Sequence, residues 1–148
     1  MPVLKNAVEA VLAGHPTYSE VFPCRPSTAA TGRTLVRGVL GMWHLDGLAD
    51  RAELIVTELI ANASRHTPCP EIRLVVGRPS ATRVRVGIVD EEPSLLPELS
   101  HAGEEDEAGR GLFLVEAMAD RWGCDLQSSG GCLRGKEVWA ELHAEDHE

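Results

Sequence analysis

Two polar residues, Glu58 and Asn62, lie four positions apart within a stretch whose remaining residues have the pattern of a buried helix. Residues four apart are neighbours on one face of an α-helix, so the carboxylate and the amide would lie close together. A carboxylate can polarise a water or a hydroxyl, and an amide oxygen is a hard ligand that suits Mg²⁺. The pair could therefore serve phosphoryl transfer. The alternative is an ordinary surface glutamate followed by an asparagine near a helix end.

The helix that must carry this pair spans residues 50–67. Its apolar residues recur at helical spacing and predict a buried stripe: Leu48, Ala52, Ile55 and Leu59, broadened by Leu54. The row that holds Glu58 and Asn62 begins at Leu54 and lies about 100° around the helix from Leu59. We therefore expect both polar side chains beside the buried face, where a cleft would begin.

Composition limits what this helix can belong to. The chain has 148 residues and 43% hydrophobic content, which is enough for one domain with a real core. Its formal charge of −9 argues against direct nucleic-acid binding, which needs clustered Lys and Arg. An anionic nucleotide is still compatible, because backbone amides and a bound cation can neutralise it locally.

The N-terminal apolar run is too short to span a membrane and lacks the pattern of a signal peptide, so we expect a cytoplasmic protein. The four cysteines, Cys24, Cys69, Cys124 and Cys132, have no CxxC spacing. Neither a zinc site nor a disulfide framework is indicated. Cys124 and Cys132 flank an expected hairpin and could face one another.

Before the organising helix, the pattern predicts three elements. Residues 3–13 have amphipathic helical spacing and end at Gly14, so they could dock on the domain or pair with a second chain. Residues 18–24 are typical of a short strand at a sheet edge, since Pro23 cannot donate a ladder hydrogen bond. Ser27 is a plausible N-cap for a helix that runs to about Trp43.

After Pro68 and Pro70 the period of the pattern changes to two. Residues 72–76 and 84–88 predict two strands joined near residues 78–82, in a sheet with one buried face. Asp90 follows the second strand directly, where a carboxylate is well placed to accept hydrogen bonds from a ligand. Residues 91–108 contain two prolines and many acidic residues, and they predict a mobile loop.

Gly109-Arg110-Gly111 ends this loop, and helical spacing then resumes toward Trp122. Two glycines at a helix start let backbone N–H groups approach an anion closely, and the helix dipole adds to the attraction. The alternative is a flexible helix start without a ligand.

The pattern of residues 124–142 predicts a hairpin that turns at residues 128–131. Val138, Ala140 and Leu142 would lie on one face of it and Trp139 on the other. Gly135-Lys136 interrupts the second strand, and it predicts either a bulge or close approach of the backbone to a ligand.

The order of these signals resembles the GHKL or histidine-kinase-like ATPase superfamily, and within it the short actinobacterial regulators similar to anti-sigma-factor serine kinases. ELIANASRH resembles the family's N box, VGIVDEEPSLLP its first glycine box, EAGRGLFLVEAMADRWG its second, and GKEVWAEL its closing strand motif. The resemblance covers residues 18–142. It leaves residues 1–17 as an N-terminal helical extension and residues 143–148 as a polar tail.

The resemblance implies a Bergerat-type ATP-binding fold, an α/β two-layer sandwich in which a mixed sheet has helices packed on one face. It implies that Asn62 holds Mg²⁺ against the nucleotide phosphates and that Glu58 is the base that activates the attacking hydroxyl. Asp90 would accept a hydrogen bond from the adenine amino group. The phosphates would meet Gly109, Arg110 and Gly111.

Glu137 departs from the related motif GKTVWAEL, whose Thr helps to hold the adenine end. A carboxylate cannot donate a hydrogen bond unless it is protonated, so adenine affinity should be lower. Glu91-Glu92-Pro93 also departs from the glycine pattern of full histidine kinases, and a domain carrying a phosphoacceptor histidine is absent from the pattern.

The resemblance implies an ATP-dependent protein serine/threonine kinase. It would transfer the γ-phosphate to an antagonist protein and thereby control a sigma factor, and it could form a homodimer. The alternative, which Glu137 and the acidic loop favour, is a catalytically weak or inactive module of the same fold that senses nucleotide and acts through protein contacts. A metabolic enzyme with a small-molecule substrate has little support, because the sequence indicates neither a second substrate pocket nor a nucleophile motif.

Overall fold

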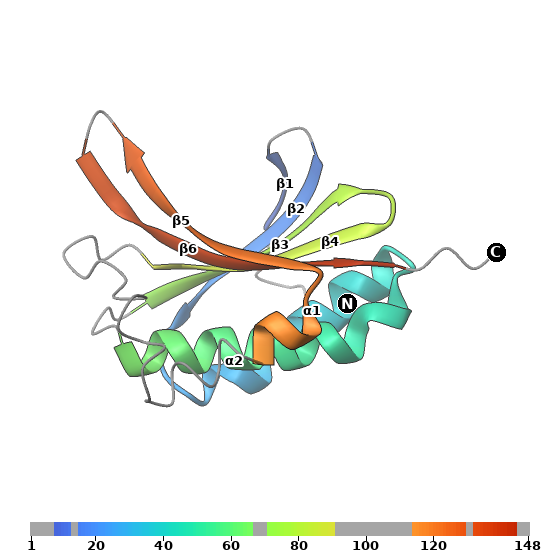
Figure 1. The fold of residues 1–148 in the computed structure, drawn as a ribbon, viewed down its shortest axis with the longest axis horizontal. Coiled ribbons are helices and arrows are strands. Elements are labelled where there is room, and N and C mark those ends of the chain that lie inside the picture. Colours follow the sequence, from blue (N-terminus) through green and yellow to red (C-terminus); the bar gives the residue numbers. More distant parts are fainter. Residues whose placement is uncertain (1–7, 13–14, 67–70, 91–113, 130–131, 145–148) are drawn as a thin grey trace.

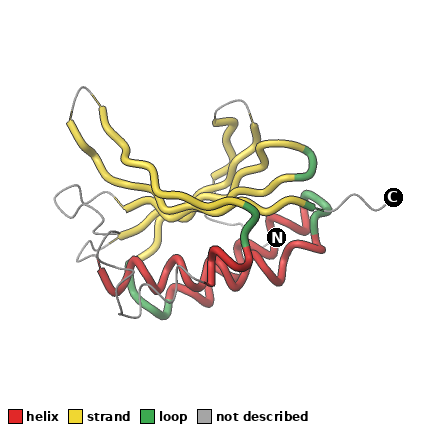
Figure 2. The backbone as a smooth tube through the Cα atoms, in the orientation of Figure 1, coloured by secondary structure: helices red, strands yellow, loops and turns green. Residues whose placement is uncertain are grey.

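The computed structural model describes residues 8–12, 15–66, 71–90, 114–129 and 132–144. One six-stranded sheet, in the order β1-β2-β3-β4-β6-β5, is covered on one face by two long helices (Figure 1). Figure 2 shows the same two layers, with both helices on one side of the strands. The elements are β1 (Val8–Leu12), β2 (His15–Pro23), α1 (Thr28–Met42), the short 3₁₀ turn η2 (Asp46–Leu48), α2 (Ala49–His66), β3 (Glu71–Ser80), β4 (Arg83–Asp90), β5 (Arg121–Ser129) and β6 (Cys132–His143). The predicted α/β two-layer sandwich is confirmed.

The sheet is antiparallel at every pairing that the described residues make, so the expected mixed sheet is wrong. β4 and β5 do run in the same direction, but the β5–β6 hairpin places β6 between them. In the same way the β3–β4 hairpin places β3 between β2 and β4. Strands of equal direction are therefore never neighbours.

The N-terminal prediction is wrong over Val8–Leu12, which form strand β1 rather than a helix. Val8 pairs with Ser19 and Leu12 with His15, in a tight hairpin with β2. A short apolar run fits a strand as well as a helix, and pairing with an existing strand decides between them. β2 is consequently an interior strand, and Pro23 is its last residue, where a missing donor costs least.

The two predicted long helices are confirmed as α1 and α2. The core between helices and sheet includes the expected stripes: Leu35, Val36, Val39, Leu40, Leu48, Ala52, Ile55 and Leu59. Leu54 is 46% exposed, so it does not broaden the buried stripe as expected. Ser27 stands at the N-cap of α1 without a side-chain capping bond. The Thr28 hydroxyl instead donates to the Pro23 carbonyl at 2.6 Å.

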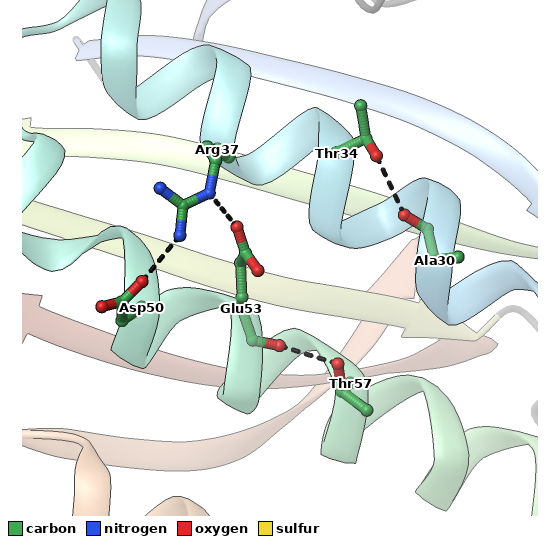
Figure 3. Close-up of polar contacts among 6 residues, drawn as sticks. All are labelled: Ala30, Thr34, Arg37, Asp50, Glu53 and Thr57. Atoms are coloured by element: carbon green, nitrogen blue, oxygen red, sulfur yellow. Dashed lines mark hydrogen bonds and ion pairs between the residues drawn. The ribbon is translucent and has the colours of Figure 1, made fainter.

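Polar contacts hold α1 against α2 (Figure 3). The Arg37 guanidinium binds the Glu53 carboxylate through Nε and the Asp50 carboxylate through Nη2, the latter at 2.7 Å. One turn further along, Arg33 Nη1 donates to Thr57 Oγ1 at 3.0 Å. These contacts lie on the exposed side of the helix pair. The buried stripe of α2 sets its rotation, and these contacts are compatible with it.

The segment after the undescribed residues 91–113 is helical over residues 114–118. Val115 is completely buried in the core, and Arg51 Nη1 of α2 donates to the Met118 carbonyl at 3.3 Å. The helix does not continue to Trp122 as expected, because β5 has already begun at Arg121.

The predicted C-terminal hairpin is confirmed, with Val138, Ala140 and Leu142 in the core and Trp139 on the opposite face. Cys124 pairs with Val138 while Cys132 pairs with Ser129, so the two backbones are about 16 Å apart along the strand and too distant for a disulfide. Gln127 pairs with Gly135 and Ser128 with Leu133. The extra residue between them makes the interruption near Gly135 a β-bulge.

Candidate functional site

A small cavity lies between the C-terminal half of α2, the end of β4 and the middle of β6. The described residues that line it are Leu59, Asn62, Ala63, Ile88, Asp90, Lys136 and Val138. Its volume is about 30 Å³, which is room for a water molecule rather than for a cofactor. Its floor is apolar, and three polar side chains converge on it, which is the usual composition of a ligand site.

Asn62 is where the buried face of α2 meets this cavity. Its Oδ1 is completely buried and has no hydrogen-bond partner among the described residues. Leaving a buried acceptor unpaired costs about 1–3 kcal/mol, so native proteins rarely keep one without a use for it. A hard cation or a polar ligand would satisfy this oxygen. The side chain therefore fits the role of a Mg²⁺ ligand.

Asp90 and Lys136 form the polar end of the cavity. They are register partners on β4 and β6, so their side chains share the helix-facing side of the sheet. Lys136 Nζ lies 2.8 Å from Asp90 Oδ2, and the two side chains are only 14% and 3% exposed. Asp90 thus lines the same cavity as Asn62, and its contact with adenine stays a prediction. Lys136 was not among the expected site residues, although its spacing from Val138 places both on one face.

Glu137 does not join these residues, and the prediction that it lies at the nucleotide site is wrong for this geometry. It pairs with Val89, and alternation along β6 turns its side chain to the face away from the helices. There Arg85 Nη2 donates to Glu137 Oε1 at 3.3 Å. Burial raises the pKa of the Glu137 carboxyl, and neighbouring Arg85 opposes part of that rise.

Arg85 also organises the rest of this outer face. Its guanidinium stacks over Trp139, 4.1 Å from the ring centroid, and Arg121 approaches the same ring at 5.6 Å. Arg85 also contacts Asp125 at 3.3 Å. The outer face therefore carries charged side chains that pair with one another, and they are separate from the cavity on the helix side.

Glu58 is half-buried on α2, one turn before Asn62, but it does not line the cavity. It makes no hydrogen bond or ion pair with any residue of the described ranges. Its carboxylate thus belongs to the turn of α2 before Asn62 and has no partner among the residues that the structure describes. Gly109, Arg110 and Gly111 lie outside the described residues, so the expected phosphate contacts are not placed.

Metal binding at this site would depend on few protein ligands. Among the residues that the structure describes, no three His, Cys, Asp or Glu side chains cluster as a metal site. Mg²⁺ commonly takes only one or two protein ligands and completes its shell with water and substrate phosphates. The single amide oxygen of Asn62 is compatible with that mode.

The described helices include none that is both long and apolar enough to cross a membrane.

A family model of the histidine kinase-like ATPase domain matches residues 22–139. This span contains the cavity and most of the sheet, and it shows that the chain belongs to the histidine kinase-like ATPase domain family. Membership of this family supports an ATP-binding regulatory domain. The chain is also similar to an uncharacterised protein of Streptomyces coelicolor, with 39% identity over 80 residues that cover 53% of this chain and 73% of the relative.

Proposed function

We propose that this protein is a cytoplasmic, ATP-dependent regulatory kinase. It transfers the γ-phosphate of Mg-ATP to a Ser or Thr of a partner antagonist protein, and it controls a sigma factor through that partner. The observation that carries the proposal is that the buried Oδ1 of Asn62, in the same cavity as Asp90, has no hydrogen-bond partner among the described residues. A Mg-nucleotide must be bound at its metal ion and at its base. The Asn62 oxygen suits the cation, and the Asp90 carboxylate suits the amino group of the base.

The residues have distinct roles in this proposal. Asn62 supplies an oxygen to Mg²⁺, and Asp90 accepts a hydrogen bond from the adenine amino group. Bound Mg²⁺ neutralises the phosphate charge that develops during transfer. Glu58, half-buried and unpaired among the described residues, accepts the proton of the attacking hydroxyl. Gly109, Arg110 and Gly111 contact the phosphates.

The partners follow from the resemblance to anti-sigma-factor kinases, and a second copy of the chain is a further candidate. Partners are best found by capture on the purified protein from the native cytoplasm with and without Mg-ATP. Phosphosite mapping of the retained proteins then identifies the acceptor. A Ser or Thr that becomes phosphorylated only with ATP supports the kinase, and retention without any phosphorylation contradicts it.

Catalysis is tested with radiolabelled γ-phosphate and the captured partner. Glu58→Gln should bind Mg-ATP as the parent does but transfer phosphate at least about a hundredfold more slowly, as expected for loss of a general base. Asn62→Ala should lose both. Glu116→Gln, at an exposed position of the helical segment 114–118, is the matched control and should transfer normally. Unchanged transfer by Glu58→Gln contradicts the proposed mechanism.

A second candidate is a nucleotide-sensing interaction module without kinase activity. Two observations favour it: Glu58 does not line the cavity, and Lys136 already binds Asp90. Calorimetry with Mg-ATP distinguishes these two candidates from a protein that no longer binds nucleotide. Binding with full partner retention but no phosphate transfer would establish the sensing module.

A further inference from the structure

The cavity beside Asn62 is too small for a nucleotide in the arrangement that the structure describes. Its volume is about 30 Å³, whereas pockets for drug-sized ligands start at roughly 300 Å³. Its apolar floor of Leu59, Ile88 and Val138 nonetheless has the composition of a ligand site. A nucleotide that contacts Asp90 must therefore first displace a side chain.

Lys136 is the side chain that closes the polar end of the cavity. It belongs to the lining, is only 14% exposed, and holds its Nζ 2.8 Å from Asp90 Oδ2. Asp90 also has interactions beyond this pair, so displacement of Lys136 does not leave its carboxylate without contacts. Lysine has a flexible four-carbon stem and a strongly hydrated ammonium, so its head regains hydration when it leaves a shielded position. Lys136 can thus leave the cavity by rotation of its own side chain.

The neighbouring strand offers the displaced side chain a second position. Leu126 on β5 is the register partner of Lys136 on β6, so the two side chains share the helix-facing side of the sheet. Leu126 is 55% exposed. A lysine stem can lie along such an apolar side chain while its ammonium stays in water. The sheet therefore provides a closed and an open position for Lys136.

We propose that Lys136 is a gate of the nucleotide site. Before binding, its side chain closes the cavity and pairs with Asp90. On binding, its stem moves onto Leu126, its ammonium enters solvent, and the adenine amino group donates to the Asp90 carboxylate. The gate rests on the nucleotide site of the proposed function, but not on kinase activity. Because only the open arrangement binds, the closed one lowers the observed affinity in proportion to its population.

Calorimetry with Mg-ATP on the parent and on Lys136→Thr gives the first test. Threonine is short, suits a strand and keeps a donor for Asp90, so it opens the cavity while the strand is kept. Lys136→Thr should bind Mg-ATP at least about tenfold more tightly than the parent. Lys136→Arg keeps the length and the charge, and it should bind as the parent does. Arg83→Thr makes the same change of charge at an exposed position of β4 and should also bind as the parent does.

The outcomes separate the gate from the site. Equal or weaker binding of Mg-ATP by Lys136→Thr overturns the gate and leaves the nucleotide site standing. Absence of binding by both proteins overturns the proposed nucleotide site as well. Binding by Lys136→Thr alone supports the gate, since a closed site then accounts for the silent parent. Circular dichroism confirms that each variant is folded.

The open position is tested by Leu126→Ser. This substitution should weaken Mg-ATP binding by about threefold in the parent and leave it unchanged in Lys136→Thr, which has no stem to place. Equal weakening in both backgrounds would mean that Leu126 contacts the nucleotide itself. That result, or no weakening in either, overturns the open position over Leu126.

Amine acylation tests the gate on the unmodified protein, and it decides the matter should Lys136→Thr fail to fold. Lys5 and Lys136 are the two lysines of the chain, and mass spectrometry follows each separately. A ligand ordinarily protects the side chains of its site, whereas a displaced gate becomes more reactive. Mg-ATP should therefore speed the labelling of Lys136 relative to that of Lys5. Slower or unchanged labelling of Lys136, at nucleotide concentrations where calorimetry shows binding, overturns the gate.

Discussion

Lys136 and Asp90 face each other across β6 and β4 and form an ion pair that is shielded from solvent by α2. Removing Lys136 takes an opposite charge away from the buried Asp90 carboxylate, whereas replacing both residues often costs little. We expect Lys136→Met to lower the free energy of unfolding by about 3–5 kcal/mol, and the double variant Asp90→Asn with Lys136→Met to recover most of that loss. Urea denaturation measures both, and equal losses in the two variants would contradict the expectation.

Lys136 also shows what a sequence can indicate at a site and what it cannot. The closing motif places Gly135, Lys136 and Glu137 in succession, and only strand alternation decides which side chain turns toward the helices. Val138 is an expected core residue, so a period of two already puts Lys136 on the core side and Glu137 on the other. The resemblance drew attention to Glu137. The physical pattern indicates Lys136.

Glu137 provides a prediction of pH dependence. Burial raises the pKa of its carboxyl from the usual 4.5, so the folded state holds this proton more tightly than the unfolded chain does. The stability linked to that proton is fully present below about pH 4.5 and is lost as the pH rises through the raised, folded-state pKa. The free energy of unfolding of the parent should therefore fall relative to that of Glu137→Gln as the pH is raised from 4.5 to neutral.

Urea titrations at half-unit pH intervals check this sign. Glu116→Gln removes a carboxylate from an exposed position and controls for the change in net charge. A parent that gains stability over Glu137→Gln with rising pH would show that the Arg85 pairing outweighs burial.

Gly32 of α1 packs directly against α2. A Cβ placed there would lie 2.8 Å from Ile60 Cδ1, deep in the core. Overpacking costs about 1–3 kcal/mol, which exceeds the gain of about 1 kcal/mol from replacing a helical glycine by alanine. Gly32→Ala should therefore lower stability.

Gly41 is the matched control in the same helix, since a Cβ there meets only Asp46 Oδ1 at an ordinary 3.5 Å. Gly41→Ala should raise stability by up to about 1 kcal/mol. Thermal unfolding compares the two variants. Opposite signs support the close helix contact, and a stabilising effect at both positions would contradict it.

The long elements could be predicted because their periodicity is sustained. α1, α2 and the two hairpins β3–β4 and β5–β6 each repeat their pattern over many residues, and burial then follows from it. β1 could not be predicted, because its five residues, four of them apolar, fit either period, and only the presence of β2 beside them selects a strand. The antiparallel pairing of the sheet could not be predicted either. It depends on the order of the strands in the sheet, which the sequence pattern does not give.

At Asn62, a substitution that stabilises the ligand-free fold should at the same time remove nucleotide binding. Its Oδ1 is buried without a partner among the described residues, so this unpaired oxygen lowers the free energy of unfolding of the ligand-free protein. Asn62→Leu replaces the amide with an apolar group of similar size, and it should raise the melting temperature of the nucleotide-free protein while abolishing the further rise that Mg-ATP gives the parent. Asn62→Asp keeps an oxygen ligand and is the control, since it should retain a Mg²⁺-dependent response. Thermal melts with and without Mg-ATP test all three proteins. A lower melting temperature for Asn62→Leu would mean that the amide stabilises the fold, and a retained ATP response would remove Asn62 from the site.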